Sequence, residues 1–447
     1  MAENHEPAAP VLALLFMSCG VENEDAEDEV IDVDRYPSFV TGEFIDQDKN
    51  NPLVKKKMKK RTTKKHSGKG VGVFVRVLCQ IILGVSFAFS GFVKAIDPLG
   101  STYKIEDYLS AFGPFWEYFE FLAFPASILL AAVEFTMGVN FLLNANIKLT
   151  KWCAVLFMLV MTPLTLYIAL ENPVSDCGCF GDAIVLSNWA TFWKNIVFSI
   201  LLLLLIVLPK FSKDIYYNYQ KWIITSVAFI ASIGISIYCY NHLPIIDFRP
   251  YKIGTNVLKS MEIPADAEPD VYETTFIYEK DGIEQEFTLS NFPDESEGWM
   301  FIEQKTTLVK KGYEPPIHDF SMTNNMGDDI TYEVLEKEGF VFLLVVYDVS
   351  KAEQQFAEKI NEIHQLAQFS GIDFYALTAS VDEDIETFCQ ATNATYEWCK
   401  TDPITLKTII RANPGLVLIE NGVIIGKWNS RDIPSAKEIQ EQFLLND

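Results

Sequence analysis

The sequence predicts a bundle of membrane-spanning α-helices followed by an α/β domain outside the membrane. The chain has 447 residues, a mean hydropathy of +0.13 and a formal net charge of −24. An apolar chain that is also strongly acidic must carry the two properties in different segments. Residues 245–447 hold 37 acidic and 16 basic side chains, and therefore almost all of the negative charge. This composition argues against a basic nucleic-acid binder, and the length suggests two or three domains.

Residues 1–70 form a polar segment before the first long apolar stretch. The run from Lys55 to Lys69 carries nine basic residues and no acidic one. We expect a mostly disordered cytoplasmic tail. A competing interpretation is a bacterial lipoprotein signal with Cys19 as the lipidated residue. The residues before it contain no lysine or arginine, which such signals normally have.

Residues 71–244 are expected to form a five-helix membrane domain. Apolar stretches lie near 71–96, 119–144, 150–170, 187–209 and 221–243. Each is about as long as a helix that crosses a hydrocarbon core of roughly 30 Å. A single stretch could be a buried helix of a soluble protein, but five in succession, joined by short polar loops, predict membrane spans.

The charges of the connecting loops predict the orientation. Basic residues precede the first stretch and follow the second and fourth, whereas the loops after the first and third are acidic. Positively charged loops stay on the cytoplasmic side. We therefore expect a multi-pass protein of the inner membrane with a cytoplasmic N-terminus and a periplasmic C-terminal domain.

Two cysteines in the loop after the third stretch, Cys177 and Cys179, are the candidate redox pair. They are separated by one glycine and lie on the side where disulfides can form. A Cys-x-Cys disulfide closes a small strained ring, and strain raises the reduction potential. Two unreactive thiols and a metal site are the alternatives, although no nearby histidine completes a metal site.

The cysteine loop, with Ser90-Gly-Phe-Val-Lys94, Asp97-Pro98 and Glu134, resembles the MauE-like branch of the DoxX superfamily. The resemblance covers roughly residues 71–210 and implies a four-helix membrane bundle. It also implies thiol–disulfide work by Cys177 and Cys179, alongside a thioredoxin-like partner. The fifth stretch and the additional C-terminal domain depart from the family's pattern.

Glu134 is an ionisable residue in the middle of the second apolar stretch. A charge at membrane depth costs several kcal/mol unless it is paired or hydrogen-bonded. Lys94 and Lys194 are the nearest candidate partners, and Asn195 completes the expected membrane polar cluster. A structural ion pair, a proton relay and contact with a quinone head group are the interpretations that the sequence leaves open.

Residues 245–314 are expected to form a small β-rich linker domain. Alternating runs at 273–278 and 285–289 flank the turn residues Asp281-Gly282. This spacing is typical of a β-hairpin.

Residues 315–447 show an alternation of strands and helices. We expect strands at 329–332, 340–347 and 373–378, helices at 352–368, 383–390 and 434–445, and a hairpin at 416–428 with Asn421-Gly422 in its turn. The run 340–347 is apolar throughout, which is typical of a strand buried on both faces.

This order resembles a thioredoxin-like fold of the extracytoplasmic TlpA type, and Asn413-Pro414-Gly415 lies where that family has its cis-proline. The segment after the strand at 340–347 contains no Cys-x-x-Cys, so this domain cannot exchange dithiols at that position. We expect it to bind a partner through the surface around Asn413, Pro414 and Gly415.

Two further cysteines, Cys389 and Cys399, lie in this domain. A structural disulfide between them and two separate buried thiols are both consistent with the sequence.

These observations favour an inner-membrane protein that supports thiol–disulfide exchange or maturation of envelope proteins, either as an oxidoreductase or as an accessory subunit of one. Its expected partners are the lipid bilayer and envelope clients or a periplasmic thioredoxin-like redox protein. A membrane quinone is a candidate electron acceptor, and no metal is expected. The alternative is a non-catalytic assembly scaffold whose cysteines are structural.

Overall fold

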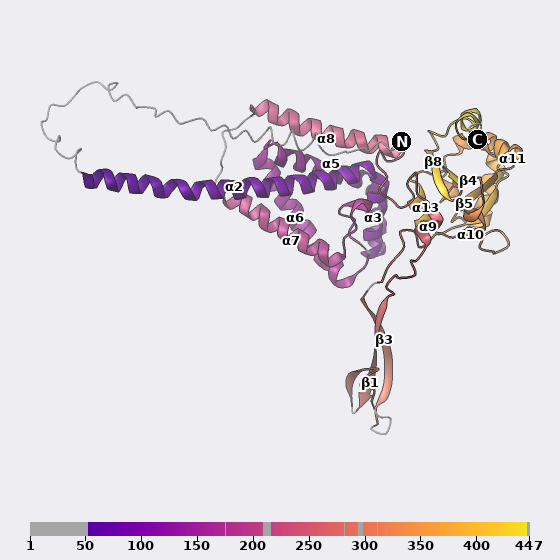
Figure 1. Cartoon of the computed structure of the whole chain (residues 1–447), viewed down its shortest axis with the longest axis horizontal. Coiled ribbons are helices and arrows are strands. Elements are labelled where there is room, and N and C mark those ends of the chain that lie inside the picture. The colour runs from indigo at the N-terminus through magenta and orange to yellow at the C-terminus, as the bar shows by residue number, and fades with distance from the viewer. Residues whose placement is uncertain are drawn as a thin grey trace. The chain divides into compact units, whose positions relative to one another are not determined.

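The structure is a computed structural model that describes residues 52–174, 176–208, 216–280, 282–293, 298–310 and 312–444. Cys19 and most of the predicted tail lie outside the described residues. The segment Gly68–Asp447 forms one compact unit. This unit contains a helical domain, a three-stranded sheet and an α/β domain (Figure 1).

Five of the described helices are long and apolar enough to cross a membrane, which confirms the predicted spans. They are the segment Val71–Ile96 of α2 (Pro52–Ile96), Glu120–Leu142, which includes α5 (Ala123–Leu142), α6 (Ile147–Glu171), α7 (Asn188–Val207) and α8 (Asn218–Asn241). Their outward faces keep many large apolar side chains exposed, as expected where lipid replaces water.

Two glycines set the closest approach between helices of this domain. A Cβ atom on Gly91 of α2 would lie 2.2 Å from the backbone nitrogen of Phe135, and one on Gly138 of α5 would lie 2.1 Å from that of Ala88. Small residues allow the backbones of membrane helices to approach closely, which maximises van der Waals contact. The contact between α2 and α5 therefore depends on glycine at both positions.

The fifth helix, α8, packs along α5 (Figure 1). Its Thr225 donates a hydrogen bond to Asn140 Oδ1 of α5 at 2.9 Å, and Asn146 donates from its amide to Thr225. Near the other end of α8, the ring of Tyr240 contacts that of Phe124, with 4.6 Å between centroids. Polar and aromatic contacts thus attach this helix to the rest of the bundle.

A helix that the sequence analysis did not predict, α3 (Pro98–Ala111), follows the first membrane span. Asp97 caps it by accepting a hydrogen bond from Gly100 N at 2.9 Å, and Pro98 occupies its first turn. Proline favours the first turn of a helix and aspartate favours the cap. The Asp97-Pro98 pair is therefore the local sequence signal for the start of α3, in addition to its part in the family resemblance.

The linker region forms a three-stranded antiparallel sheet in the order β2-β1-β3. The predicted hairpin is confirmed as β1 (Val271–Lys280) and β2 (Ile283–Thr288), and β3 (Met300–Lys310) is an additional strand. Aromatic side chains gather around Tyr278, whose ring contacts those of Phe287, Phe292 and Phe301.

The C-terminal domain contains a five-stranded mixed sheet in the order β6-β5-β4-β7-β8. The strands are β4 (Phe340–Val345), β5 (Asp373–Thr378), β6 (Glu397–Lys400), β7 (Gly415–Glu420) and β8 (Val423–Asn429). The pairs β4–β5 and β5–β6 are parallel, whereas β4–β7 and β7–β8 are antiparallel. The predicted hairpin with Asn421 and Gly422 at positive φ joins β7 to β8.

Helices cover both faces of this sheet. On one face lie α9 (Val257–Met261), α10 (Thr331–Glu336) and α13 (Pro403–Ile409), and on the other α11 (Ala357–Phe369), α12 (Asp382–Thr392) and α14 (Ala436–Ile439). Residues of β4 alternate between the two cores, which confirms a strand buried on both faces. The Asn413–Pro414 bond is cis. This strand order, with a cis-proline before β7, is a thioredoxin-like fold.

Three predicted elements differ in the structure. The strand expected at 329–332 is wrong, because Thr331 begins α10, and only Asp329 pairs, through an isolated bridge to Thr323. The helix expected from 352 begins at Ala357, after two short 3₁₀ turns. The last helix begins at Ala436 and passes into a π-helical turn at Gln440–Leu444.

The disulfide considered between Cys389 and Cys399 is not formed, and both cysteines are free. The β6 side chain of Cys399 is fully buried in the core on one face of the sheet, whereas Cys389 of α12 packs into the core on the other face. The sheet itself separates the two sulfur atoms, so the structure favours two separate thiols.

We predict that Gly91→Ala and Gly138→Ala each lower the thermal stability of the bundle, because the new methyl group would overlap the facing backbone. Overpacking of this kind costs about 1–3 kcal/mol. Gly234→Ala in α8 is the matched control, because no atom lies within 4 Å of its Cβ position. Thermal unfolding of the full chain in detergent would measure all three, and equal stability of Gly91→Ala and Gly234→Ala would contradict the close contact.

Candidate redox site

The cysteine loop, residues 172–187, connects α6 to α7 and carries both candidate cysteines. The Sγ atoms of Cys177 and Cys179 lie 3.1 Å apart, and both cysteines are free. Gly178 between them has φ +63°, and a Cβ there would lie 3.1 Å from Cγ of Lys104. Glycine thus supplies both the left-handed conformation and the space that bring the two sulfur atoms together.

The two thiols have opposite pKa shifts. The hydrogen bond from Cys177 lowers the pKa of Cys179 to about 6 against the effect of burial, and Lys194 and Lys94 lower it further. The same hydrogen bond, with burial, raises the pKa of Cys177. The 3.1 Å contact thus allows one proton to be shared between the two sulfur atoms, with the thiolate favoured on Cys179, the more exposed of the two.

A buried polar cluster of Ser90, Lys94 and Glu134 lies beneath the loop. Lys94 Nζ is 2.8 Å from Glu134 Oε2, and both side chains are less than a tenth exposed. Ser90 Oγ lies 2.6 Å from the same carboxylate oxygen and accepts a hydrogen bond from Lys94 at 2.8 Å. This confirms Lys94 as the partner of Glu134 and adds Ser90, one helical turn earlier on α2.

The polar cluster holds the cysteine loop directly. Lys94 donates to the carbonyl oxygen of Cys179 at 2.7 Å, and Ser90 Oγ lies 2.6 Å from the same oxygen. The three ammonium hydrogens of Lys94 thus find three acceptors: Ser90, Glu134 and Cys179. The ion pair and the position of Cys179 are therefore linked.

The other two predicted members of the cluster lie at its edge. Lys194 Nζ of α7 lies 4.5 Å from the centre of the Phe180 ring, a cation–π contact between α7 and the loop. Asn195 donates to Thr165 Oγ1 at 3.1 Å, between α7 and α6. Both residues line a cavity of about 20 Å³ with Ser90, Glu134 and Cys179, which is enough space for one water molecule.

Helix α3 supports the other cysteine. Tyr108 donates a hydrogen bond to the carbonyl oxygen of Cys177 at 2.7 Å. Lys104 pairs with Asp176 at 2.8 Å, and Asp176 accepts a hydrogen bond from Gly178 N. At the far end of the loop, Asn188 donates to Val174 O at 3.0 Å. The described part of the loop is therefore fixed from three helices.

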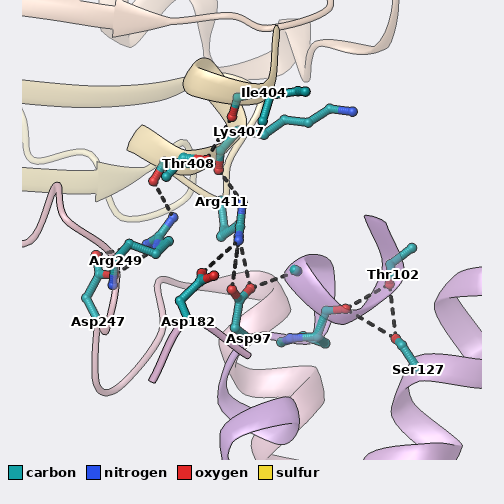
Figure 2. Close-up of polar contacts among 12 residues, drawn as sticks. Asp97, Thr102, Ser127, Asp182, Asp247, Arg249, Ile404, Lys407, Thr408 and Arg411 are labelled. Atoms are coloured by element: carbon teal, nitrogen blue, oxygen red, sulfur yellow. Dashed lines mark hydrogen bonds and ion pairs between the residues drawn. The ribbon is translucent and has the colours of Figure 1, made fainter. Parts of the chain in front are cut away.

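The C-terminal domain contacts the helical domain through Arg411, which is buried (Figure 2). Its guanidinium lies 3.0 Å from each carboxylate oxygen of Asp97 and 3.4 Å from Asp182, which belongs to the cysteine loop. Burial raises the pKa of Asp97, but Arg411 and Arg249 outweigh it and hold that pKa below the ordinary value. Arg411 also lies over the ring of Tyr103 of α3.

A second group of charges lies nearby. Asp247 accepts from Arg249 at 2.7 Å, and Arg249 also donates to Thr408 O (Figure 2). Lys427 donates a further hydrogen bond to Asp247 at 2.8 Å. A cavity of about 230 Å³ lies between these groups, α3, α13 and the cysteine loop at Gly178. The loop therefore lines part of this cavity, and residues of the C-terminal domain line another part.

The predicted partner surface is only partly open. Pro414 and Gly415 are buried, and Asn413 is half-buried, with its amide donating to Asp348 O at 2.7 Å. Partner binding at these residues stays a prediction. Among the described residues, no group of three or more His, Cys, Asp or Glu side chains could hold a metal ion.

Sequence reasoning did not identify the roles of Tyr108, Asp182 or Arg411. Each acts across a long sequence separation: Arg411 lies 314 residues from Asp97, and Tyr108 lies 69 residues from Cys177. Asp182 was visible within the loop, but nothing in the sequence indicated its partner.

Comparisons with known proteins agree with this organisation. A family model described as methylamine utilisation protein MauE matches residues 72–208, which include the first four spans and the cysteine loop. A model described as a domain of unknown function (DUF8463) matches residues 272–311, the three-stranded sheet. No curated protein matches the chain.

Solved structures resemble parts of the chain at low identity. A Bacteroides thetaiotaomicron protein described as a protein disulfide isomerase is 18% identical, with 28% of this chain and 86% of that chain covered and a TM-score of 0.23. A secreted Mycobacterium tuberculosis disulfide oxidoreductase is 14% identical, with 28% and 92% covered and a TM-score of 0.22. A thioredoxin-like protein from Bacteroides caccae is 9% identical, with 71% and 94% covered and a TM-score of 0.21. The fold assignment rests on the strand order instead.

We predict that Lys94→Met destabilises the helical domain by about 3–5 kcal/mol, because it leaves the Glu134 carboxylate buried without its partner. The double variant Lys94→Met/Glu134→Leu should recover a large part of this loss. Thermal unfolding of the full chain in detergent measures both variants. A double variant as unstable as the sum of the two single variants would contradict the ion pair.

We predict that alkylation of Cys179 by iodoacetamide increases with a midpoint near pH 6, as its thiolate forms. Cys177→Ala removes the hydrogen-bond donor and should move the midpoint towards the ordinary thiol value of about 8.5. Mass spectrometry of the peptide that contains the loop reads out the modified sulfur. A midpoint above pH 8 in the unmodified sequence would exclude the proposed sharing of a proton.

Proposed function

We propose that this chain, in which a MauE-like membrane domain precedes a thioredoxin-like domain, exchanges disulfides with envelope proteins at Cys177 and Cys179. The observation that supports this most directly is the pair itself. Its two sulfur atoms are 3.1 Å apart, and Cys179 has a pKa of about 6. A thiolate beside a resolving thiol is the arrangement that dithiol exchange requires.

The exchange has two balanced steps. The Cys179 thiolate attacks one sulfur of a client disulfide, the client S–S bond breaks, and the second client sulfur leaves as a thiolate. Cys177 then transfers its proton to the released thiolate and attacks Cys179, which forms the Cys177–Cys179 disulfide and frees the client. Two electrons pass to the client, and the same steps in reverse oxidise a client dithiol.

The proposed orientation places this chemistry at the periplasmic face of the inner membrane. The C-terminal domain contacts the end of α2, the cysteine loop and, through Arg431 and Asn241, the end of α8. These segments share one side of the helical domain. The loops on that side are acidic, which supports a cytoplasmic N-terminus and a periplasmic C-terminal domain.

The thioredoxin-like domain is proposed to bind and not to catalyse. The segment after β4 contains Tyr347, Asp348 and a 3₁₀ turn at Val349–Lys351 in place of a cysteine pair. Tyr347 instead faces α3, with its hydroxyl 3.5 Å from that of Tyr103. This surface therefore contacts α3, and clients or a periplasmic redox partner would bind beside it.

A membrane quinone stays a proposal for the electron acceptor. The cavity beside Cys179 has room for about one water molecule and does not fit a quinone head group unless its lining moves. The two exchange steps above therefore involve only the cysteines and the client.

A non-catalytic scaffold is the competing function, and the absence of a cysteine pair in the thioredoxin-like domain favours it. In that case Cys177 and Cys179 would be structural. Two free sulfur atoms held 3.1 Å apart, with Cys179 partly exposed, are placed for exchange, and the lowered pKa of Cys179 agrees with this, which is why we prefer exchange.

Trapping of mixed disulfides tests the two functions. Cys177→Ser removes the resolving thiol, so we expect Cys179 to accumulate mixed disulfides with envelope proteins in intact cells. Cys179→Ser, which lacks the nucleophile, should trap far fewer, and Cys399→Ser should behave as the unmodified chain. Non-reducing electrophoresis with mass spectrometry identifies the products. Equal trapping by the two loop variants, or none by either, would favour the scaffold.

A further inference from the structure

The interdomain cluster of Asp97, Asp182 and Arg411 connects the thioredoxin-like domain to the segment that carries the reactive sulfur atoms. Arg411 lies between α13 and the cis-proline, and its neighbours Ile410 and Ala412 are buried in the core of that domain. Its side chain is therefore held by a rigid part of the fold. Figure 2 shows it pointing out of the sheet region towards both aspartates.

The geometry of the contact between Arg411 and Asp97 suits a guanidinium group. Arg411 binds both carboxylate oxygens through Nε and Nη2 and donates through Nη1 to Lys407 O. A Cβ on Gly100 would lie 2.8 Å from Arg411 Nη2 and 2.4 Å from Asp97 Oδ2, so the absence of a side chain leaves space for the pair. Bidentate geometry of this kind fixes both position and orientation.

Asp182 links the position of Arg411 to the conformation of the cysteine loop. Gly181 N donates to Gly178 O at 3.1 Å, and Ala183 N donates to Phe180 O at 3.3 Å. Two consecutive turns therefore connect Asp182 to Gly178 and Cys179, so a displacement of Asp182 would displace the sulfur-bearing residues. Lys94 of α2 donates a hydrogen bond to the carbonyl oxygen of Cys179.

We propose that Arg411 is a positioning residue for the exchange at Cys179, acting through Asp182. This inference rests on the proposed function, and it gives the thioredoxin-like domain, which has no cysteine pair of its own, a specific role. The domain holds the cysteine loop in the geometry that keeps the two sulfur atoms adjacent and the Cys179 carbonyl against Lys94. Without Arg411, Asp182 would lose its contact with the thioredoxin-like domain, and the loop would keep only its contacts with α2, α3 and α7.

The charges that face Cys179 come from several elements: Lys94 on α2, Glu134 on α5, Lys194 on α7 and Cys177 in the loop itself. Tyr108 on α3 also interacts with Cys179, whereas Arg411 acts on Asp97 and Asp182. A movement of the loop is distinguished from the loss of the Arg411 charge by Gly100→Ala, which displaces the guanidinium without changing any charge.

The test is the pH profile of Cys179 alkylation in the full chain, which needs no client. For Arg411→Gln we expect the midpoint to rise by about one pH unit, so that the rate at pH 6 falls about fivefold. Asp182→Asn should give a similar shift, and the double variant should shift no further, because both changes remove the same contact. Gly100→Ala, which displaces the guanidinium without changing any charge, should act in the same direction.

Arg431→Gln is the matched control. Arg431 also joins the two domains, through Asn241 of α8, and pairs with Glu353 of its own domain, but it does not contact the cysteine loop. We expect its profile to equal that of the unmodified chain. An unchanged profile for Arg411→Gln, or an equal shift for Arg431→Gln, would overturn the proposal. Neither result bears on the exchange function, because Cys177→Ser would still trap mixed disulfides. If that trapping failed while the Arg411→Gln profile shifted, only the exchange function would be refuted.

Discussion

The organisation of this protein depends on the three hydrogen bonds of the Lys94 ammonium group. A cation buried within a helical bundle requires compensation, and Glu134 on α5 supplies the charge. Ser90 and the carbonyl of Cys179 supply the remaining acceptors. The interaction that stabilises the bundle therefore also determines where the cysteine loop lies. The close approach of α2 and α5 at Gly91 and Gly138 brings Lys94 and Glu134 within reach of each other.

The cysteine loop lies between two anchors of different origin. Lys94 holds it from the membrane domain, and Arg411 contacts it from the thioredoxin-like domain. Between these anchors, Gly178 allows the sulfur atoms to approach to 3.1 Å. The C-terminal domain is strongly acidic, yet it contributes a buried arginine where it contacts the loop.

The sequence was sufficient for features that follow from local patterns. The five spans, the strand at 340–345, the Asn421-Gly422 hairpin and the Cys177–Cys179 pair depend on periodicity, turn chemistry and spacing, and the structure contains all of them. The cost of a buried charge indicated Lys94 and Lys194 as candidate partners for Glu134, and the structure pairs Glu134 with Lys94. Helix α3 and the contact of Arg411 with Asp97 could not be predicted in this way, because they depend on how distant segments pack. The strand expected at 329–332 was wrong because a short alternating run has no local feature that excludes a helical turn.

The redox state of the loop in intact membranes tests the central claim most directly. Cells are quenched with acid, the free thiols are then alkylated at neutral pH under denaturing conditions, and the peptide that contains Cys177 and Cys179 is quantified by mass spectrometry after growth under oxidising and reducing conditions. The account predicts that a fraction of the chain carries a Cys177–Cys179 disulfide, and that this fraction changes reversibly with the conditions. Two reduced thiols under every condition would contradict it.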